Sequence, residues 1–95
     1  MNDRDTTIAT IRSLLRRFNE ERDWDQYHSP RNLAMALSVE ASELLELYLW
    51  SKDEGPQPPV ASRISKVEEE AADVLICLLN FCHHAKIDLA AAVDK

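Results

Sequence analysis

Glycine and proline are scarce in this 95-residue sequence, which contains a single glycine, Gly55. Glycine-rich phosphate-binding loops and dinucleotide-binding fingerprints need several glycines, so neither can be built from this chain. Proline occurs only at Pro30 and within residues 56–59. Because these two residue types make most turns, their scarcity predicts long helices joined by few loops.

Cysteine and continuous apolar sequence are also limited. The two cysteines, Cys77 and Cys82, are too few for a disulfide framework and suit a reducing compartment. The longest apolar run, Val74–Leu79, has six residues, whereas a membrane span needs about twenty. The polar start, residues 1–5, is unlike a signal peptide. These features predict a cytoplasmic protein with no membrane partner.

Positive charge is the minority, with 11 basic against 17 acidic residues and a formal net charge of −6. This balance argues against a nucleic-acid partner, because binding to phosphate backbones relies on Lys and Arg. An anionic ligand would therefore have to bring a cation with it. The length predicts one domain, residues 1–95, whose small size leaves much surface to cover, so self-association is expected.

Apolar residues recur at helical spacing and predict an all-α fold. Three main helices are expected over residues 6–19, 30–50 and 62–85, with a short C-terminal helix over 89–93. Ser29 and Asp88 are placed to cap two of them. Residues 20–28 look irregular and residues 51–61 look like a loop. No run of alternating β-branched residues predicts a strand.

An acidic residue lies at the centre of the apolar face of the second helix. On a helical wheel of about 100° per residue, five apolar side chains lie within about 60° of Glu40. They are Leu33, Ala36, Leu37, Leu44 and Leu47. Glu43 lies on the same face at i, i+3. Because a buried unpaired carboxylate costs several kcal/mol, this pair predicts a cationic partner, either a metal or a basic side chain.

The third helix repeats this arrangement with Glu70 and Asp73 at i, i+3, and Glu70 lies near the azimuths of Val74, Cys77 and Phe81. Antiparallel packing of the two helices would bring the two acidic pairs together. Ligation by carboxylate oxygens alone selects Mg²⁺, or alternatively Mn²⁺. The competing interpretation is a solvated acidic surface, which is favoured for Glu46, Glu68 and Glu69.

A zinc site among the cysteines and histidines of the third helix is not favoured. Cys77 and Cys82 are about 140° apart on the helical wheel and cannot both reach one ion. A di-iron bundle would need Glu-x-x-His pairs, and neither His83 nor His84 follows a glutamate by three residues.

The motifs Glu40-Ala-Ser-Glu43 and Glu70-Ala-Ala-Asp73 resemble the metal motif of the MazG-like all-α nucleoside triphosphate pyrophosphohydrolases. The flanking sequences Glu21–Leu37 and Leu47–Trp50 resemble the dCTP pyrophosphatase branch in particular. The resemblance implies a Mg²⁺-dependent enzyme of nucleotide-pool house-cleaning that cleaves dCTP or a related (deoxy)nucleoside triphosphate to the monophosphate and pyrophosphate. It also implies a homotetramer, a dimer of dimers, of MazG-like helical bundles with active sites at subunit interfaces.

Candidate catalytic and nucleobase-binding residues follow from the same comparison. A carboxylate not fully engaged by metal can take a proton from water, and Glu43 is preferred to Glu46 for this role. The resemblance places Trp24 and Trp50 at the nucleobase pocket, although ordinary core aromatics are the alternative. His28 is a candidate contact to base or phosphate, or else a capping or surface group.

Phosphate contacts are expected near the start of the second helix, where Arg31 and Asn32 adjoin backbone N–H groups that favour anions. The resembling proteins continue with a basic segment beyond the position of Lys95. Either the sequence is truncated there, or Lys86, Lys95 or Arg31 takes over the phosphate contacts. Two other functions stay open: a catalytically silent helical oligomerisation module, and a same-fold hydrolase of dUTP or a phosphoribosyl-ATP-like nucleotide.

Overall fold

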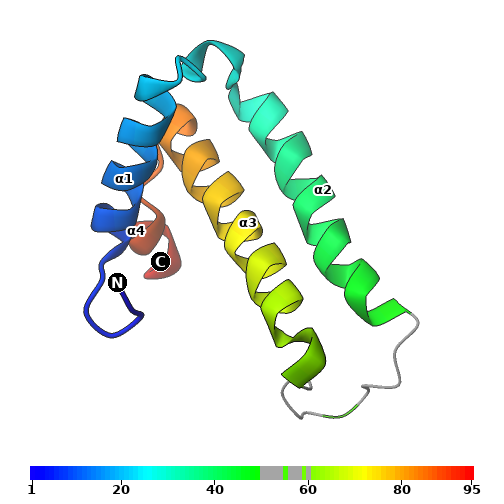
Figure 1. Ribbon diagram of the computed structural model, residues 1–95. Helices are drawn as coiled ribbons and strands as arrows, with labels where there is room; N and C mark the ends of the chain where they lie inside the picture. The colour runs from blue at the N-terminus through cyan, green and yellow to red at the C-terminus, as the bar shows by residue number, and fades with distance from the viewer. Residues whose placement is uncertain (50–54, 56–58, 60) are drawn as a thin grey trace.

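The computed structural model describes residues 1–49, 55, 59 and 61–95, and the elements within them are helical. These elements are α1 (Ile8–Glu21), a 3₁₀ turn η1 (Asp25–Tyr27), α2 (Pro30–Leu49), α3 (Ala61–Ala85) and α4 (Leu89–Val93) (Figure 1). The all-α prediction is confirmed, with three main helices and a short fourth.

Three predicted boundaries need correction. The first helix, expected from residue 6, begins at Ile8, because Thr7 is its N-cap. Residues 20–28 are not wholly irregular, because they finish α1 and contain η1. Ala61, expected in the loop, already begins α3. Most of the expected loop at residues 51–60 lies outside the described residues, as does Trp50. Among the described helices, none combines the length and the hydropathy that crossing a membrane requires.

Side-chain caps explain where three of the helices begin. Thr7 accepts a hydrogen bond from the Thr10 backbone N–H at the start of α1. The Ser29 hydroxyl accepts one from Asn32 N at 3.1 Å, and the Asp88 carboxylate accepts one from Ala91 N at 3.0 Å. Each cap satisfies a backbone donor that has no partner within its helix. The predicted caps at Ser29 and Asp88 are thus confirmed.

α2 and α3 form an antiparallel pair that packs along much of its length, whereas α1 contacts α3 near only one end (Figure 1). The apolar stripe around Glu40 faces this pairing and is buried or half-buried throughout. Where α1, α2 and α3 come together, Leu33, Leu79 and Cys82 form the most deeply buried apolar group. The core therefore lies at the end of the hairpin that α1 also covers.

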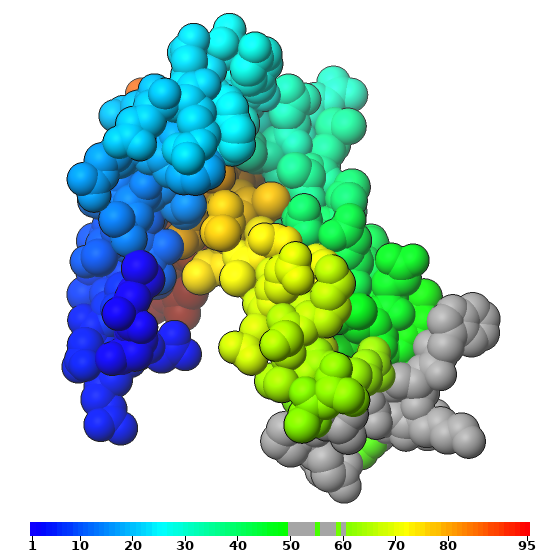
Figure 2. All heavy atoms as spheres, viewed as in Figure 1, coloured from blue at the N-terminus to red at the C-terminus, as the bar shows by residue number. Residues whose placement is uncertain are grey.

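The chain is less compact than is usual for a protein of its length. Its radius of gyration is 15.1 Å, against about 12 Å for a compact chain of this size. Figure 2 shows a hollow between the N-terminal segment with α1 and the lower part of α3. Many large apolar side chains remain exposed, among them Leu14, Phe18, Met35, Val39, Leu45, Leu49 and Leu75. A single copy therefore leaves much apolar surface in contact with water.

Two helices end in left-handed residues that are not glycine. At the end of α3, Lys86 has a φ of 59°, and Ile87 N donates to Cys82 O at 2.9 Å. At the end of α1, Asp23 has a φ of 54°, and Trp24 N donates to Asn19 O at 2.9 Å. Both are Schellman closures, in which glycine normally occupies the left-handed position. A side chain with a Cβ there costs about 1 kcal/mol.

We predict that Lys86→Gly raises the free energy of unfolding by about 0.5–1 kcal/mol, because relief of the left-handed strain exceeds the entropy that glycine adds to the unfolded chain. Chemical denaturation monitored by circular dichroism measures the change. Lys86→Ala is the matched control, since it removes the charge but keeps the Cβ. A gain in stability for the alanine variant as large as for the glycine variant would contradict the backbone explanation.

Candidate functional site

Carboxylates from two helices converge at the middle of the hairpin. Glu40 of α2 and Glu70 and Asp73 of α3 each offer an oxygen, and these oxygens lie within 4.8 Å of one another. Glu70 is buried, and the other two residues are half-buried. The antiparallel pairing predicted from the sequence is what brings them together. We call Glu40, Glu70, Asp73 and the adjoining Glu43 the acid cluster.

Glu43 joins the cluster from the exposed side of α2. Burial is the main cause that raises the pKa of Glu70, and the neighbouring Glu43 carboxylate raises that pKa further. Glu43 and Glu70 also line a cavity of about 450 Å³ together with Glu46, Leu47 and Lys66. All the acids predicted to act at the site are thus on or beside one cavity.

The acid cluster has the donors that a divalent cation needs. Glu40 Oε2 and Glu70 Oε2 are buried, and neither has a hydrogen-bond partner within the described part of the chain. Buried oxygen atoms without partners are costly, and like charges at this spacing repel. Carboxylate oxygens are the ligands that hard cations prefer. The group can therefore hold a divalent metal.

Lys66 is a charged neighbour that sequence reasoning did not identify. Its Nζ lies 3.6 Å from Glu70 Oε1 and 3.5 Å from Glu69 Oε2. This ammonium group opposes the rise in the Glu70 pKa. The signal was present in the sequence, because Lys66 and Glu70 stand at i, i+4 on one helix. Lys66 itself is more than half exposed, so it screens the buried acid only partly.

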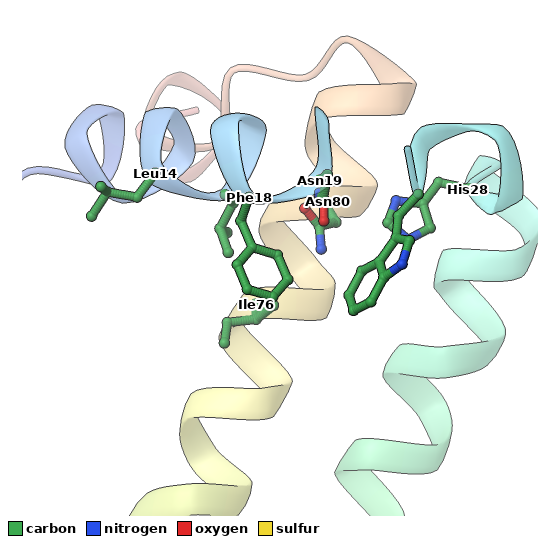
Figure 3. Close-up of a pocket in the computed structure, with 8 residues that line it drawn as sticks. Leu14, Phe18, Asn19, His28, Ile76 and Asn80 are labelled. Carbon is green, nitrogen blue, oxygen red and sulfur yellow. Dashed lines mark hydrogen bonds between the residues drawn. The ribbon is translucent and has the colours of Figure 1, made fainter. Parts of the chain in front are cut away.

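A second cavity, of about 320 Å³, lies where α1, α3 and the segment before α2 meet (Figure 3). We call it the aromatic cavity; it is lined by Leu14, Leu15, Phe18, Asn19, Trp24, His28, Ile76 and Asn80. Trp24 meets Phe18 edge to face, with ring centroids 5.3 Å apart. Because 43% of Trp24 is exposed, it is a cavity wall and not a core aromatic.

His28 lines the aromatic cavity and belongs to a polar network behind it. Burial is the first cause that lowers the His28 pKa, with the neighbouring His84 second. Asp25, His28 and His84 offer ligand atoms within 4.8 Å of one another, a second grouping of the metal-binding type. Both carboxylate oxygens of Asp25, however, accept hydrogen bonds from Arg16. Asp25 is therefore held in an ion pair, whereas His28 Nδ1 and His84 Nε2 are buried without a hydrogen-bond partner in the described part of the chain. Because His84 comes from α3, spacing along the sequence does not reveal this group.

The remaining candidate residues are not among those that line the two cavities, or they lie outside the described residues. Arg31 is exposed on the first turn of α2. Asn32 is engaged locally, because its Nδ2 donates to Tyr27 O at 3.4 Å. Lys86 lies 13 residues beyond Asp73, about 20 Å along the helix axis. Trp50 lies outside the described residues. The structure therefore places the predicted acids together at one site and Trp24 with His28 at another, whereas Arg31, Asn32 and Lys86 line neither cavity.

The fold and site have clear counterparts among known proteins. The chain is 43% identical over 89 residues to dCTP pyrophosphatase 1 of Bos taurus and equally to that of Homo sapiens. Each match covers 92% of this chain, but 53% and 52% of the respective relative, so the chain spans about half their length. No family model matches the sequence.

A solved structure is similar over nearly its whole length. The crystal structure of a pyrophosphatase from Archaeoglobus fulgidus superposes with a TM-score of 0.83 at 38% sequence identity. The match covers 99% of this chain and 88% of that one. The chain therefore belongs to the MazG-like all-α nucleoside triphosphate pyrophosphohydrolases. Within that family it is similar to the dCTP pyrophosphatases.

We predict that Arg16→Gln destabilises the protein by about 1 kcal/mol at pH 7, because it removes a two-bond ion pair with Asp25. The hydrogen bonds from Arg16 are the main cause that lowers the Asp25 pKa. A lowered carboxyl pKa stabilises the fold above the unfolded value of about 4 and loses that effect as the pH falls further.

Thermal unfolding from pH 7 down to pH 2.5 checks this expectation. The difference between parent and Arg16→Gln should shrink below about pH 4. Arg17→Gln is the control, because Arg17 is exposed on the same helix. A difference that stays constant across the range would show that Arg16 acts by packing alone.

Proposed function

We propose that this chain hydrolyses (deoxy)nucleoside triphosphates to the monophosphate and pyrophosphate, with dCTP and related dNTPs as substrates. The observation that carries the proposal is the acid cluster and the aromatic cavity on one face of α3. Asp73 of the cluster and Asn80 of the cavity are seven residues apart, which is almost two full turns and about 10.5 Å of helix. That separation suits a nucleotide, with its base in the aromatic cavity and its phosphates at the acid cluster.

Glu40, Glu43, Glu70 and Asp73 would hold Mg²⁺, with Mn²⁺ as the alternative, because their oxygens match the ligand preference of hard cations. When bound, the ion supplies charge neutralisation at the phosphates and a more acidic water. The family relationship and the unpartnered oxygens of Glu40 and Glu70 support this assignment.

Proton removal from the attacking water falls to Glu43, with Glu46 as the second candidate. Both carboxylates are exposed on the wall of the 450 Å³ cavity beside the acid cluster, where a water molecule can reach them. A general base must lie within hydrogen-bond reach of its water. Glu43 is preferred because it adjoins Glu70 within the acid cluster.

The nucleobase would stack on Trp24 in the aromatic cavity, with His28 beside it. Arg31 and Asn32 remain candidates for phosphate contacts at the start of α2. Trp50 follows the end of α2, and a helix of twenty residues is about 30 Å long. For Trp50 to touch the same nucleotide as Trp24, it must come from a neighbouring subunit or be carried back by its loop.

The first test is a panel of all dNTPs and NTPs with Mg²⁺, in which released pyrophosphate is scored separately from phosphate. We expect the products to be pyrophosphate and the nucleoside monophosphate, with dCTP and related dNTPs turned over most efficiently. Preferred turnover of dUTP or a phosphoribosyl-ATP-like nucleotide would favour the same-fold alternative. No turnover of any nucleotide would favour a silent oligomerisation module.

The acid cluster makes a sharper prediction. Glu40→Gln and Asp73→Asn should each lower kcat/KM by at least about 100-fold, since even outer-shell partners of a metal site are worth 10–100-fold. Both variants should stay folded, because each substitution relieves repulsion between like charges. Glu68→Gln is the control, as Glu68 is exposed on α3 outside the cluster. Full activity of either cluster variant at saturating Mg²⁺ would contradict the site.

We further propose a homotetramer, a dimer of dimers, as the working assembly. Met35, Val39, Leu45 and Leu49 are exposed on the outer side of α2, each to more than half of its surface. Burying such a surface against a second copy gains about 25 cal/mol per Å² of apolar area. Sedimentation at micromolar concentration should show tetramers for the parent and smaller species for Val39→Glu. A monomeric parent would refute the assembly.

A further inference from the structure

Two buried amides interrupt the apolar wall of the aromatic cavity. Asn19 of α1 is 2% exposed and Asn80 of α3 is 8% exposed. Asn19 Nδ2 donates a hydrogen bond to Asn80 Oδ1 at 3.0 Å. Figure 3 shows the two side chains together between Phe18 and His28. Their neighbours along each helix, Leu15 and Ile76, belong to the same wall, so two amides occupy positions otherwise suited to apolar residues.

The mutual hydrogen bond engages one polar atom of each amide. Asn80 keeps its Nδ2 donor and Asn19 keeps its Oδ1 acceptor, and neither atom has a further partner within the described part of the chain. Neither atom is among the fully buried unpartnered side-chain atoms of the described residues, so both atoms are accessible from the cavity that the two residues line. Both residues line the cavity, so a ligand there can satisfy them.

We infer that the Asn19–Asn80 pair reads the hydrogen-bonding edge of the nucleobase. This inference rests on the proposed function, because it assigns a nucleotide to the aromatic cavity. A base that carries an adjacent donor and acceptor matches the pair: the exocyclic amine of cytosine can donate to Asn19 Oδ1 while its ring N3 accepts from Asn80 Nδ2. Trp24 and Phe18 can pack against any aromatic ring, whereas the amides distinguish rings by their hydrogen-bonding groups.

The pair is also reversible. If both amides rotate by 180°, the mutual hydrogen bond is kept with Asn80 as donor, and the free donor and acceptor exchange places. The exchanged pattern matches the N3–H and O4 of thymine or uracil. The pair therefore selects bases with neighbouring donor and acceptor groups, and it rejects a ring of the same shape that can make no hydrogen bonds.

The test compares dCTP and dTTP with the triphosphate of difluorotoluene deoxynucleoside, a pyrimidine-shaped ring without strong hydrogen-bonding groups. The readouts are kcat/KM for pyrophosphate release and, independently of turnover, Kd by calorimetry. A good two-bond base contact is worth about 1–3 kcal/mol, which is about 5–150-fold. We expect the parent to prefer the better natural nucleotide by a factor in this range.

Asn19→Ala and Asn80→Ala should bring that ratio close to one, while binding of the isostere changes by only a few fold. Ile76→Ala is the matched control, because it opens the same wall without removing a polar group. It should weaken all three nucleotides alike and leave the ratio unchanged. If an alanine variant fails to fold in a thermal melt, Asn19→Ser and Asn80→Ser replace it.

The outcomes separate this inference from the proposed function. A parent that binds dCTP or dTTP selectively but hydrolyses neither would overturn the proposed activity and support the amide contact. A parent that hydrolyses all three nucleotides with equal kcat/KM would support the activity and overturn the amide contact. Unchanged selectivity in folded Asn19 and Asn80 variants would also overturn it, as would a parent that binds none of the three.

Discussion

The burial of like-charged carboxylates between α2 and α3 is the constraint on which the remaining architecture depends. Glu40 and Glu70 take positions that apolar residues would otherwise fill, so this part of the hairpin interface cannot be stabilised by hydrophobic contact alone. Lys66 offsets the charge only from the exposed side. The hairpin is therefore built around a group of carboxylate oxygens that can hold a cation. If the proposed metal binds there, it stabilises the folded hairpin as well as completing the site.

This arrangement displaces the apolar core toward one end. Leu33, Leu79 and Cys82 pack where α1 meets the hairpin, and the buried Asn19–Asn80 hydrogen bond links α1 to α3 at the same end. Because α1 contacts α3 near only that end, a hollow remains beside the lower hairpin (Figure 2). The outer side of α2 is exposed for a related reason, since one short chain has too few helices to cover both faces of a hairpin.

Much of this fold and part of the site could be predicted from the sequence, because both depend on local periodicity. The azimuth of Glu40 within its apolar stripe, and the capping residues Ser29 and Asp88, are properties of single helices. The Asn19–Asn80 pair joins distant segments, and the Arg16–Asp25 ion pair joins α1 to the turn that follows it, so neither pair has a helical spacing that the sequence would reveal. The left-handed Lys86 could not be predicted either, since glycine is the residue that normally marks such a position.

In the proposed function, the two cavities bind different parts of one nucleotide along α3. The cavity beside the acid cluster is lined by Glu43, Glu46 and the buried Glu70, and these carboxylates favour a metal ion together with the phosphates that it attracts. The aromatic cavity is apolar apart from His28 and the two neutral amides of Asn19 and Asn80, so it favours an uncharged aromatic ring with a polar edge. Because Asp73 and Asn80 lie on the same helix, residues 73 to 80 would set the spacing between the bound base and the phosphates. The proposed substrate would then be selected by its length as well as by its charge, and a change of base preference would need no change in the acids.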